Sequence, residues 1–371
     1  MLSFLPNRRT EASSFLPYLL ILTLAFIPVG TLTCSTAGGQ RQPAGESRTV
    51  IDAHNHLVGQ FRSPSGPASD WEGAARATLT KMDALGIKKM IIMPPPFSPD
   101  HHGIYDLEHL ADIVKEYPDR FAFLGGGETL NVIIQEAVRD SRTSSDRRRR
   151  FMERAWEILS MGAIGFGEFA IEHLCLGKKH NHQSAPADHP LFLLLADIAA
   201  KHDVPIDIHM EAVPEPMPLP KGLRSPPNPR ELSPNIEAFE RLLAHNPKAK
   251  ILWSHVGWDN TGHRTAALTA RLLEAHPNLY MSFKISPRDS LAETRPIEMG
   301  RGLKSEWLKV MREFPDRFII GSDQFYLSPK MRGQIGPRSV EPTNRFFSLL
   351  PPDLARKIGY DNPKSIFNLK D

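Results

Sequence analysis

Two histidines separated by a single residue are the first candidates for chemistry in this chain. His54 and His56 end the apolar run Val50–His56, and alternate side chains of a strand face the same way. Two neighbouring imidazoles without partners would be costly in an apolar interior, whereas a divalent metal ion binds neutral imidazole readily. Alone, the pair could equally be a chance match on a surface strand.

Four more apolar runs each end on a side chain that can bind a metal ion. These side chains are Glu168, His209, His255 and Asp323. Taken singly, a buried histidine is usually a satisfied core residue, and Gly-Ser-Asp is usually a turn. Six such side chains at five strand ends instead predict a metal site. The mixture of imidazole and carboxylate favours Zn2+, although Mn2+, Fe2+ or Co2+ would also fit.

The runs that carry these residues belong to a set of eight. They begin at residues 50, 90, 121, 163, 204, 250, 279 and 318. Each interval has room for one strand, one helix and two loops, and Leu191–His202, Ile236–Leu243 and Ala266–Ala275 are predicted helices. Strands that alternate with helices indicate parallel units, and eight such units predict an α/β fold, a (β/α)8 TIM-like barrel. Active sites of such barrels lie at the C-terminal ends of the strands.

Two segments interrupt this repeat. Residues 210–234, the proline-rich segment, hold eight prolines and follow the fifth run. Long loops are usually functional, so we expect a stiff lid or pocket wall here, with a tolerated surface insertion as the alternative. Arg147–Arg150 are expected on a solvated face or loop, with a polyanion contact as the alternative.

The N-terminal segment does not fit the barrel pattern. Arg8 and Arg9 precede an apolar run from Phe15 to Pro28, and small residues follow, which is typical of a secretory signal. We expect a signal peptide over residues 1–37, a linker over 38–49, a barrel domain over 50–371 and export to the periplasm or the extracellular space. Cys34 leaves a lipoprotein open. A membrane anchor also stays open, although the apolar run is shorter than the about 20 residues of a spanning helix.

Charge and cysteine content limit the partners. The net charge is only +3, with 45 Lys and Arg against 42 Asp and Glu, which argues against a nucleic-acid or broad membrane-binding surface. We therefore expect a small-molecule substrate and no stable membrane span after processing, while oligomeric state leaves no trace in the sequence. Only Cys34 and Cys175 are present, so the processed protein would have no internal disulfide.

The order His-x-His, Glu, His, His, Asp on successive strands resembles the amidohydrolase superfamily. Ile51–Leu57, Trp253–Gly257 and Asn362–Phe367, which is similar to a closing Asn-x-x-x-x-Phe motif, point to its amidohydrolase-related (amidohydrolase 2) branch. The resemblance covers about residues 50–368. Its strand-end motifs are specific as a set, whereas the loops, which decide the substrate, are not.

The resemblance implies roles for the matching residues. His54, His56 and Asp323 would hold a first, more buried ion, and His209 and His255 a second. Glu168 stands where many members have a bridging residue, often a carboxylated lysine, so two ions are favoured over one. Some members of the branch bind one ion without a bridge. In those members the histidine that matches His255 acts on the substrate.

This ligand set predicts a metal-dependent hydrolase. Metal-activated hydroxide would attack an amide, lactone or ester-type bond of a small molecule. Asp323 would be the catalytic proton carrier, or a ligand only. The alternative is a metal-dependent lyase, a non-oxidative decarboxylase or hydratase that acts on a small carboxylic acid. A non-catalytic binding protein is a third reading, but it would have lost metal ligands, and all six are present.

Three further residues could face the substrate. Lys284 ends the seventh run and could meet an anionic group, although a lysine there is more often simply exposed. Glu211 lies two residues beyond His209. His173 follows Glu168 and could orient a metal ligand.

Overall fold

The computed structural model describes residues 49–101, 107–177, 181–286, 291–298, 300–331 and 340–370. The predicted signal peptide and all of the predicted linker except residue 49 lie outside the described residues. The chain divides into two compact units, and the fold described below belongs to the unit Ser47–Asp371.

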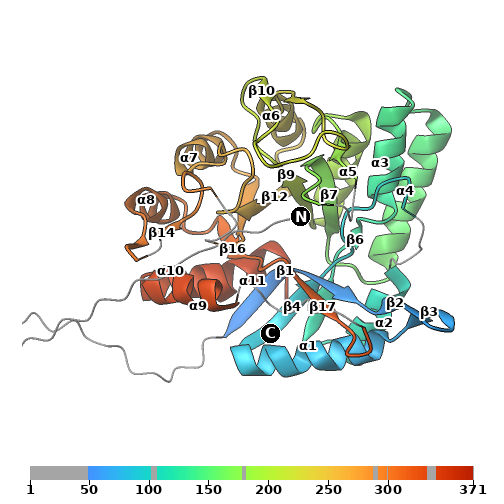
Figure 1. Ribbon diagram of the computed structural model, residues 1–371, viewed down its shortest axis with the longest axis horizontal. Helices are drawn as coiled ribbons and strands as arrows, with labels where there is room; N and C mark the ends of the chain where they lie inside the picture. The colour runs from blue at the N-terminus through green and yellow to red at the C-terminus, as the bar shows by residue number, and fades with distance from the viewer. Residues whose placement is uncertain are drawn as a thin grey trace, which may run out of the picture. The chain divides into compact units, whose positions relative to one another are not determined.

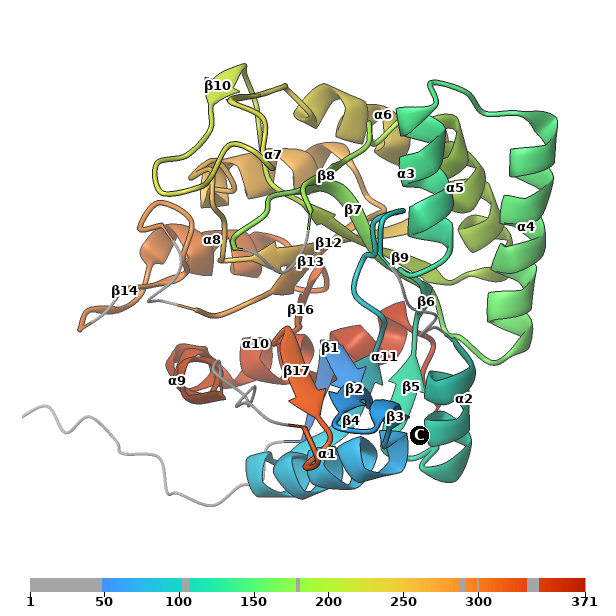
Figure 2. The ribbon, with the colours of Figure 1, turned by 45° about the vertical axis from the view of Figure 1, so that its right-hand side comes forward.

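Parallel strands at eight positions form a barrel, with the helices on its outside (Figures 1 and 2). The strands are β1 (Val50–Val58), β4 (Ile87–Ile92), β5 (Phe121–Phe123) with β6 (Gly125–Gly126), β7 (Phe166–His173), β9 (Pro205–Met210), β12 (Lys250–Val256), β13 (Leu279–Phe283), and β16 (Phe318–Ile320) with β17 (Gln324–Leu327). Every run predicted from the sequence overlaps one of these positions, so the predicted (β/α)8 barrel is confirmed.

At two of the eight positions the strand is divided into two short strands. Each of the two pairs with a different neighbour, and these pairings close the barrel. β5 pairs with β4, and β6, one residue later, pairs with β7. In the same way β16 pairs with β13, whereas β17 pairs with β1. The eighth position therefore changes neighbours over Gly321–Asp323, where the Asp323 amide donates to the carbonyl of His54 at 2.9 Å. Asp323, a candidate metal ligand, therefore lies between the two short strands of the eighth position.

The helices form the outer layer. They are α1 (Trp71–Leu85), α2 (Leu107–Glu116), α3 (Leu130–Arg139), α4 (Ser145–Ser160), α5 (Pro190–His202), α6 (Ile236–His245), α7 (Ala266–Ala275), α8 (Ser305–Glu313), α9 (Val340–Leu349), α10 (Pro352–Arg356), the π-helical turn η1 (Lys357–Asp361) and α11 (Asn362–Ile366). The predicted helix Ala266–Ala275 coincides with α7, and the other two predictions differ by one or two residues at one end. Caps define some of these ends, since Thr265 accepts from the Leu268 amide at the start of α7.

Short antiparallel pairs decorate the loops. They are β2 (Gln60–Ser63) with β3 (Gly66–Ser69), β8 (Gln183–Ser184) with β7, β10 (Met217–Pro218) with β11 (Glu231–Leu232), and β14 (Ile297–Glu298) with β15 (Gly302–Leu303). Arg147–Arg150 lie on α4, and the predicted solvated face is confirmed for Arg148–Arg150, which are exposed. The side chain of Arg147 is only 13% exposed and pairs with Asp140. In the described part of the chain no helix is long and apolar enough to cross a membrane.

Strand alternation separates two apolar clusters. Ile251 and Trp253 of β12 belong to the large cluster between strands and helices, whereas Leu252 belongs to a smaller one with Leu124 and Ile319. Ile366 and Phe367, from the chain's C-terminal end, complete the smaller cluster. Leu252 and Ile319 precede His255 and Asp323 on their strands, so this cluster fills the barrel interior beneath the predicted metal site.

Candidate metal centre

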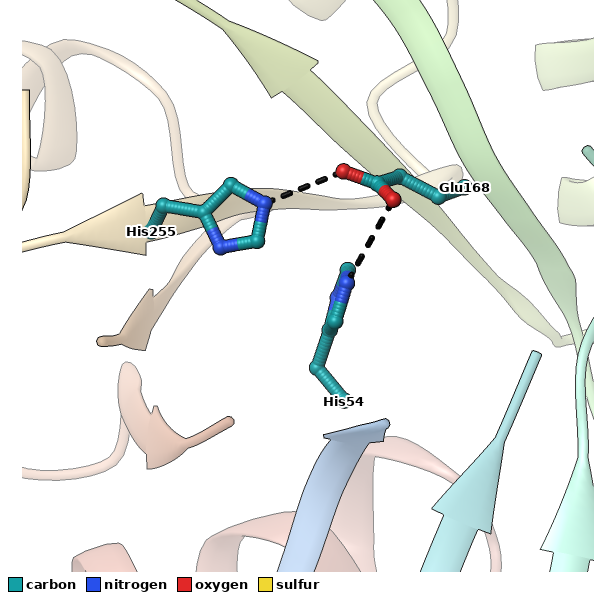
Figure 3. Close-up of side chains that lie close together, drawn as sticks. All are labelled: His54, Glu168 and His255. Carbon is teal, nitrogen blue, oxygen red and sulfur yellow. Dashed lines mark hydrogen bonds and ion pairs between the residues drawn. The ribbon is translucent and has the colours of Figure 1, made fainter. Parts of the chain in front are cut away.

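The six predicted ligands converge at the C-terminal ends of the barrel strands. His54 and His56 come from β1, and the others follow from β7, β9, β12 and the residues after β16: Glu168, His209, His255 and Asp323. All are buried except Asp323, whose side chain is 13% exposed. Figure 3 shows His54 and His255 both directed at the carboxylate of Glu168.

Glu168 lies between two pairs of histidines. Its Oε2 is 3.6 Å from the Nε2 atoms of both His54 and His56. Its Oε1 is 2.8 Å from Nδ1 of His209 and 3.0 Å from Nε2 of His255. Each carboxylate oxygen therefore faces one pair, which is the arrangement that a bridging ligand requires.

Asp323 completes the first pair on the opposite side. Its Oδ1 is 3.2 Å from Nε2 of His56 and 3.9 Å from Nε2 of His54. Its Oδ2 is 2.5 Å from Nζ of Lys284 and 3.9 Å from Nδ1 of His255. Asp323 thus contacts both the histidines and the ammonium group of Lys284, which lines the cavity.

The donor set fits a divalent metal ion. Ligand atoms about 2.0–2.2 Å from one ion lie roughly 3–3.5 Å apart, close to the spacings above. Two groups keep their ligand atoms within 4.8 Å of one another: His54, His56 and Asp323, and His54, Glu168 and His255. Within the described chain, the buried Nε2 of His54 and Nδ1 of His255 have no hydrogen-bond partner, and both nitrogens could bind a metal ion in the neutral form of the ring.

The outer nitrogens of the first pair fix the tautomers. Nδ1 of His54 lies 3.1 Å from Oδ2 of Asp207, and Nδ1 of His56 lies 2.9 Å from the carbonyl of Met93. Both partners can only accept, so each Nδ1 donates, and in the neutral form of each ring Nε2 would have the lone pair that a metal ion binds. Asp207 also accepts from Ser254 at 2.7 Å. The sequence analysis missed Asp207, although its place two residues before His209 on one strand was a usable signal.

Charge within the cluster keeps the carboxylates ionised. Burial opposes the ionisation of Glu168, but the charge of His54 and hydrogen bonds from His209 and His255 hold the pKa of Glu168 well below its usual range. Burial likewise opposes ionisation of Asp323, and the positive charge of Lys284 holds its pKa well below the usual range. Burial lowers the pKa of His255 to about 3, so this imidazole is neutral. The ionised carboxylates and the neutral His255 are forms that bind a cation. Burial opposes the protonation of His54, but Asp207 and Glu168 raise its pKa well above the usual value, so a metal ion bound there would displace a proton.

Two of the ligands have an unusual backbone conformation. His255 has a φ of 66° and Asp323 a φ of 50°, in the left-handed region that non-glycine residues rarely adopt. In β12 the positive φ of His255 occurs where two consecutive side chains both face inward. Ser254 contacts Asp207, and His255 contacts Glu168. Such strain persists where the surrounding structure imposes it, commonly at functional sites.

A cavity of about 590 Å³ opens onto the centre. The three predicted substrate residues, Lys284, Glu211 and His173, all line it. Lys284 Nζ lies 3.9 Å above the Trp258 ring, while the Glu211 carboxylate accepts from the amide of Asn260 at 3.0 Å. The sequence analysis did not find the apolar lining residues, which include Pro95, Phe97, Leu174, Leu176, Trp258 and Phe325.

The proline-rich segment is not the lid or pocket wall that its length suggested. Of its residues only Glu211 lines the cavity, and the segment instead packs behind the loop that follows β7. Leu174 of that loop is buried against Val213 and Leu232. Glu211 enters the cavity because it follows β9 directly, whereas most residues of 214–234 are exposed, as in the alternative of a surface insertion.

Comparisons with known proteins were made for sequence and structure. A family model described as Amidohydrolase matches residues 175–369, more than half of the chain. No curated protein matches.

Solved structures of similar fold include three proteins of low sequence identity. A probable 2-pyrone-4,6-dicarboxylic acid hydrolase from Acinetobacter baumannii is 12% identical and has a TM-score of 0.49, with 87% of this chain and 100% of that chain covered. A 2,6-dihydroxybenzoate decarboxylase from Rhizobium is 16% identical, with a TM-score of 0.47 and coverage of 86% and 99%. A 4-oxalomesaconate hydratase from Rhodopseudomonas palustris is 14% identical, with a TM-score of 0.48 and coverage of 86% and 96%.

Proposed function

Because the chain belongs to the amidohydrolase family, we propose that it is a metal-dependent hydrolase of an amide, lactone or ester-type bond in a small molecule. The observation that supports this most is the position of Glu168, whose two oxygens face different histidine pairs. A carboxylate in that position can bridge two ions, and we propose Zn2+ as the metal.

The residues around the cavity support the same chemistry. A divalent ion held by this ligand set would polarise a substrate carbonyl and lower the pKa of water to about 7. Asp323 is ionised and only partly exposed, so it can accept a proton from the attacking water and deliver it to the leaving group. Lys284, 2.5 Å from Asp323, offers a positive charge to an anionic substrate group.

A lyase that acts on a small carboxylic acid is the second candidate. Among the cavity-lining residues that the structure describes, Lys284 is the one lysine or arginine, and it lies beside the metal ligands. A single positively charged side chain beside the candidate metal ligands suits a substrate with one carboxylate. This candidate needs only one metal ion and no bridging role for Glu168.

Metal content separates the bridged centre from a single-ion centre. We expect about two ions per chain in the wild type and one or fewer in Glu168→Ala, as measured by elemental mass spectrometry. Glu172→Ala is the matched control, because Glu172 is a buried glutamate of the same strand that binds His182 and Ser184 instead. One ion that is unaffected by Glu168→Ala would contradict the bridge, and no metal in the wild type would contradict metal dependence.

The reaction itself is tested with the metal-loaded protein in water labelled with heavy oxygen. The panel comprises lactones, esters, amides and aromatic carboxylic acids. We expect the label in the new carboxylate of a product and loss of turnover in Asp323→Asn. Release of carbon dioxide from an acid, with no hydrolysis in the rest of the panel, would instead establish the lyase.

A further inference from the structure

We propose that Asn228, in the proline-rich segment, is a positioning residue that sets the apolar wall of the active-site cavity and so limits which substrates the cavity accepts. The inference rests on the proposed function in one respect, namely that substrate occupies this cavity. It concerns the loop after β7, which supplies Leu174 and Leu176 to the cavity lining.

The side chain of Asn228 clamps the backbone of the residue between these two leucines. Its Oδ1 accepts from the amide of Cys175 at 2.8 Å, and its Nδ2 donates to the carbonyl of Cys175 at 3.0 Å. Nδ2 also donates to the carbonyl of Arg224 at 3.0 Å. Asn228 is 2% exposed, so these bonds are shielded from water. A carboxamide suits this task because it carries a donor and an acceptor side by side.

The clamped backbone lies beyond the support of the barrel. β7 ends at His173, where its pairing with β8 also ends. Leu174, Cys175 and Leu176 follow with no strand pairing. The amide of Asn228 therefore fixes the peptide groups on both sides of Cys175, and with them the directions of the two leucines.

Apolar packing holds Asn228 and the wall together. Leu174, Val213 and Leu232 form a buried cluster, and Met217, Leu219 and Leu223 pack on it. The backbone of the segment is braced where the Leu219 amide donates to the Arg230 carbonyl at 2.8 Å. Its prolines restrict the chain further, since each fixes its own φ. Asn228 is thus presented by a stiff support, as a positioning residue requires.

The hydrogen bonds that orient the candidate metal ligands do not involve Asn228, and the wall approaches these ligands through His173, whose ring lies 4.2 Å from that of His209 between centroids. His209 and His255 are oriented by Glu168, and His54 by Asp207. Removal of the Asn228 amide should therefore loosen Leu174 and Leu176 while the ligands keep their places. The expected consequence is weaker binding of substrates that reach the apolar wall, with the chemical step unchanged.

Hydrogen exchange of the metal-loaded protein tests the clamp directly. We expect the backbone amide of Cys175 to exchange about tenfold faster in Asn228→Ala than in the wild type, because one hydrogen bond that protects it is gone. Asn278→Ala is the matched control: Asn278 is also buried and also donates to backbone carbonyls, those of Leu243 and Ala249, away from the cavity. If Asn228→Ala does not fold, Asn228→Asp takes its place. It keeps an acceptor for the Cys175 amide but puts a carboxylate oxygen against the carbonyls of Cys175 and Arg224, with faster exchange of the peptide 172–177 as the expected result. Unchanged exchange in the variant would overturn the inference.

Substrate selectivity tests the functional part. We expect KM for p-nitrophenyl hexanoate to rise several-fold in Asn228→Ala, with KM for p-nitrophenyl acetate, kcat and metal content within about twofold of the wild type, because only the longer acyl chain reaches the wall. An equal loss with both esters would indicate a general structural defect and overturn the inference. If the wild type hydrolyses neither ester, the proposed ester hydrolysis fails, and exchange at Cys175 alone decides whether Asn228 sets the wall.

Discussion

His54 and His56 of the candidate centre are each oriented by the contact of the outer ring nitrogen. For His54 that contact is Asp207, a carboxylate with 0% exposure that also accepts from Ser254. A carboxylate behind a metal-binding imidazole holds the ring and increases its basicity. Asp207 therefore belongs to the site, although its own carboxylate faces away from the candidate ligand atoms.

Replacement of Asp207 should weaken metal binding. We expect Asp207→Asn to lower metal affinity by about 10- to 100-fold, because the amide no longer supplies a charged acceptor to Nδ1 of His54. A titration against a competing chelator measures this. Asp203→Asn is the control, since Asp203 is an aspartate next to the same strand that pairs with Lys250 instead. Equal affinities for wild type and Asp207→Asn would contradict the orienting role.

A second buried group of charges lies behind His209. Glu211, Asp259 and Arg264 are all fully buried, and Asn260 donates to Glu211. Burial and, to a smaller extent, the adjacent carboxylate of Glu211 together raise the pKa of Asp259 to about 7, against the opposing charge of Arg264. The pair therefore holds one proton, on Asp259, under mildly acidic conditions.

The raised pKa of Asp259 predicts a pH-dependent stability. Between about pH 4 and about pH 7 the folded protein binds more protons at this group than the unfolded chain does, so its contribution to stability falls as pH rises through that window. Asp259→Asn does not titrate and keeps a donor for Glu211. We expect the urea midpoint of Asp259→Asn, relative to the wild type, to rise between about pH 5 and about pH 8. A difference that does not change with pH would show that Asp259 ionises normally.

At the scale of elements, the split eighth strand position places Asp323. Gly321 lies at the break between β16 and β17, and its amide donates to the carbonyl of Phe283 at 2.9 Å. A Cβ at this position would lie 2.4 Å from Oγ of Ser282 and 2.6 Å from Cβ of His54. Only glycine lets β16 approach β1 and β13 closely enough for Asp323 to reach the histidines.

A methyl group at Gly321 should therefore disturb both fold and site. We expect Gly321→Ala to lower the free energy of unfolding by about 1–3 kcal/mol, the usual cost of overpacking, and to weaken metal binding through His54. Chemical denaturation and metal titration measure the two effects. Gly177→Ala is the matched control, because a methyl group there meets no atom within 4 Å. Wild-type stability and affinity in Gly321→Ala would contradict the close packing.

At the scale of the whole barrel, the candidate ligands tie together distant parts of the chain. They come from five of the eight strand positions, and His54 and Asp323 are 269 residues apart. An ion that binds only the folded protein stabilises it by about 2.7 kcal/mol when its concentration is 100 times Kd. The centre should thus act as a cross-link at the open end of the barrel.

Removal of metal should accordingly lower thermal stability. We expect a strong chelator to reduce Tm by about 5 °C or more and Zn2+ to restore it. Differential scanning calorimetry of the holoprotein measures this, and the Glu168→Ala protein should respond less than the wild type. An unchanged Tm in protein shown to be metal-free would argue against a structural link between the strands.

Much of the architecture could be predicted from the sequence because its causes are local. Alternating strands and helices indicate the barrel, and side-chain alternation assigns His54 and His56 to one face. In a parallel barrel all strand ends meet at one rim, so Glu168, His209, His255 and Asp323 could be grouped without knowledge of their contacts. The N-terminal secretory signal is likewise inferred from a local pattern of charged, apolar and small residues, and the signal peptide stays a prediction.

Other features depend on contacts between residues far apart in the chain, and only the tertiary structure decided them. The partners of His54 and His56, the division of the Glu168 oxygens between two histidine pairs, and the position of Asn228 behind the cavity wall all depend on which loops pack together. Periodicity assigns a residue to a face but does not identify its neighbour across the barrel. For that reason the proline-rich segment looked like a lid, whereas it is largely a surface segment whose Val213 and Leu232 are buried against Leu174 of the loop after β7.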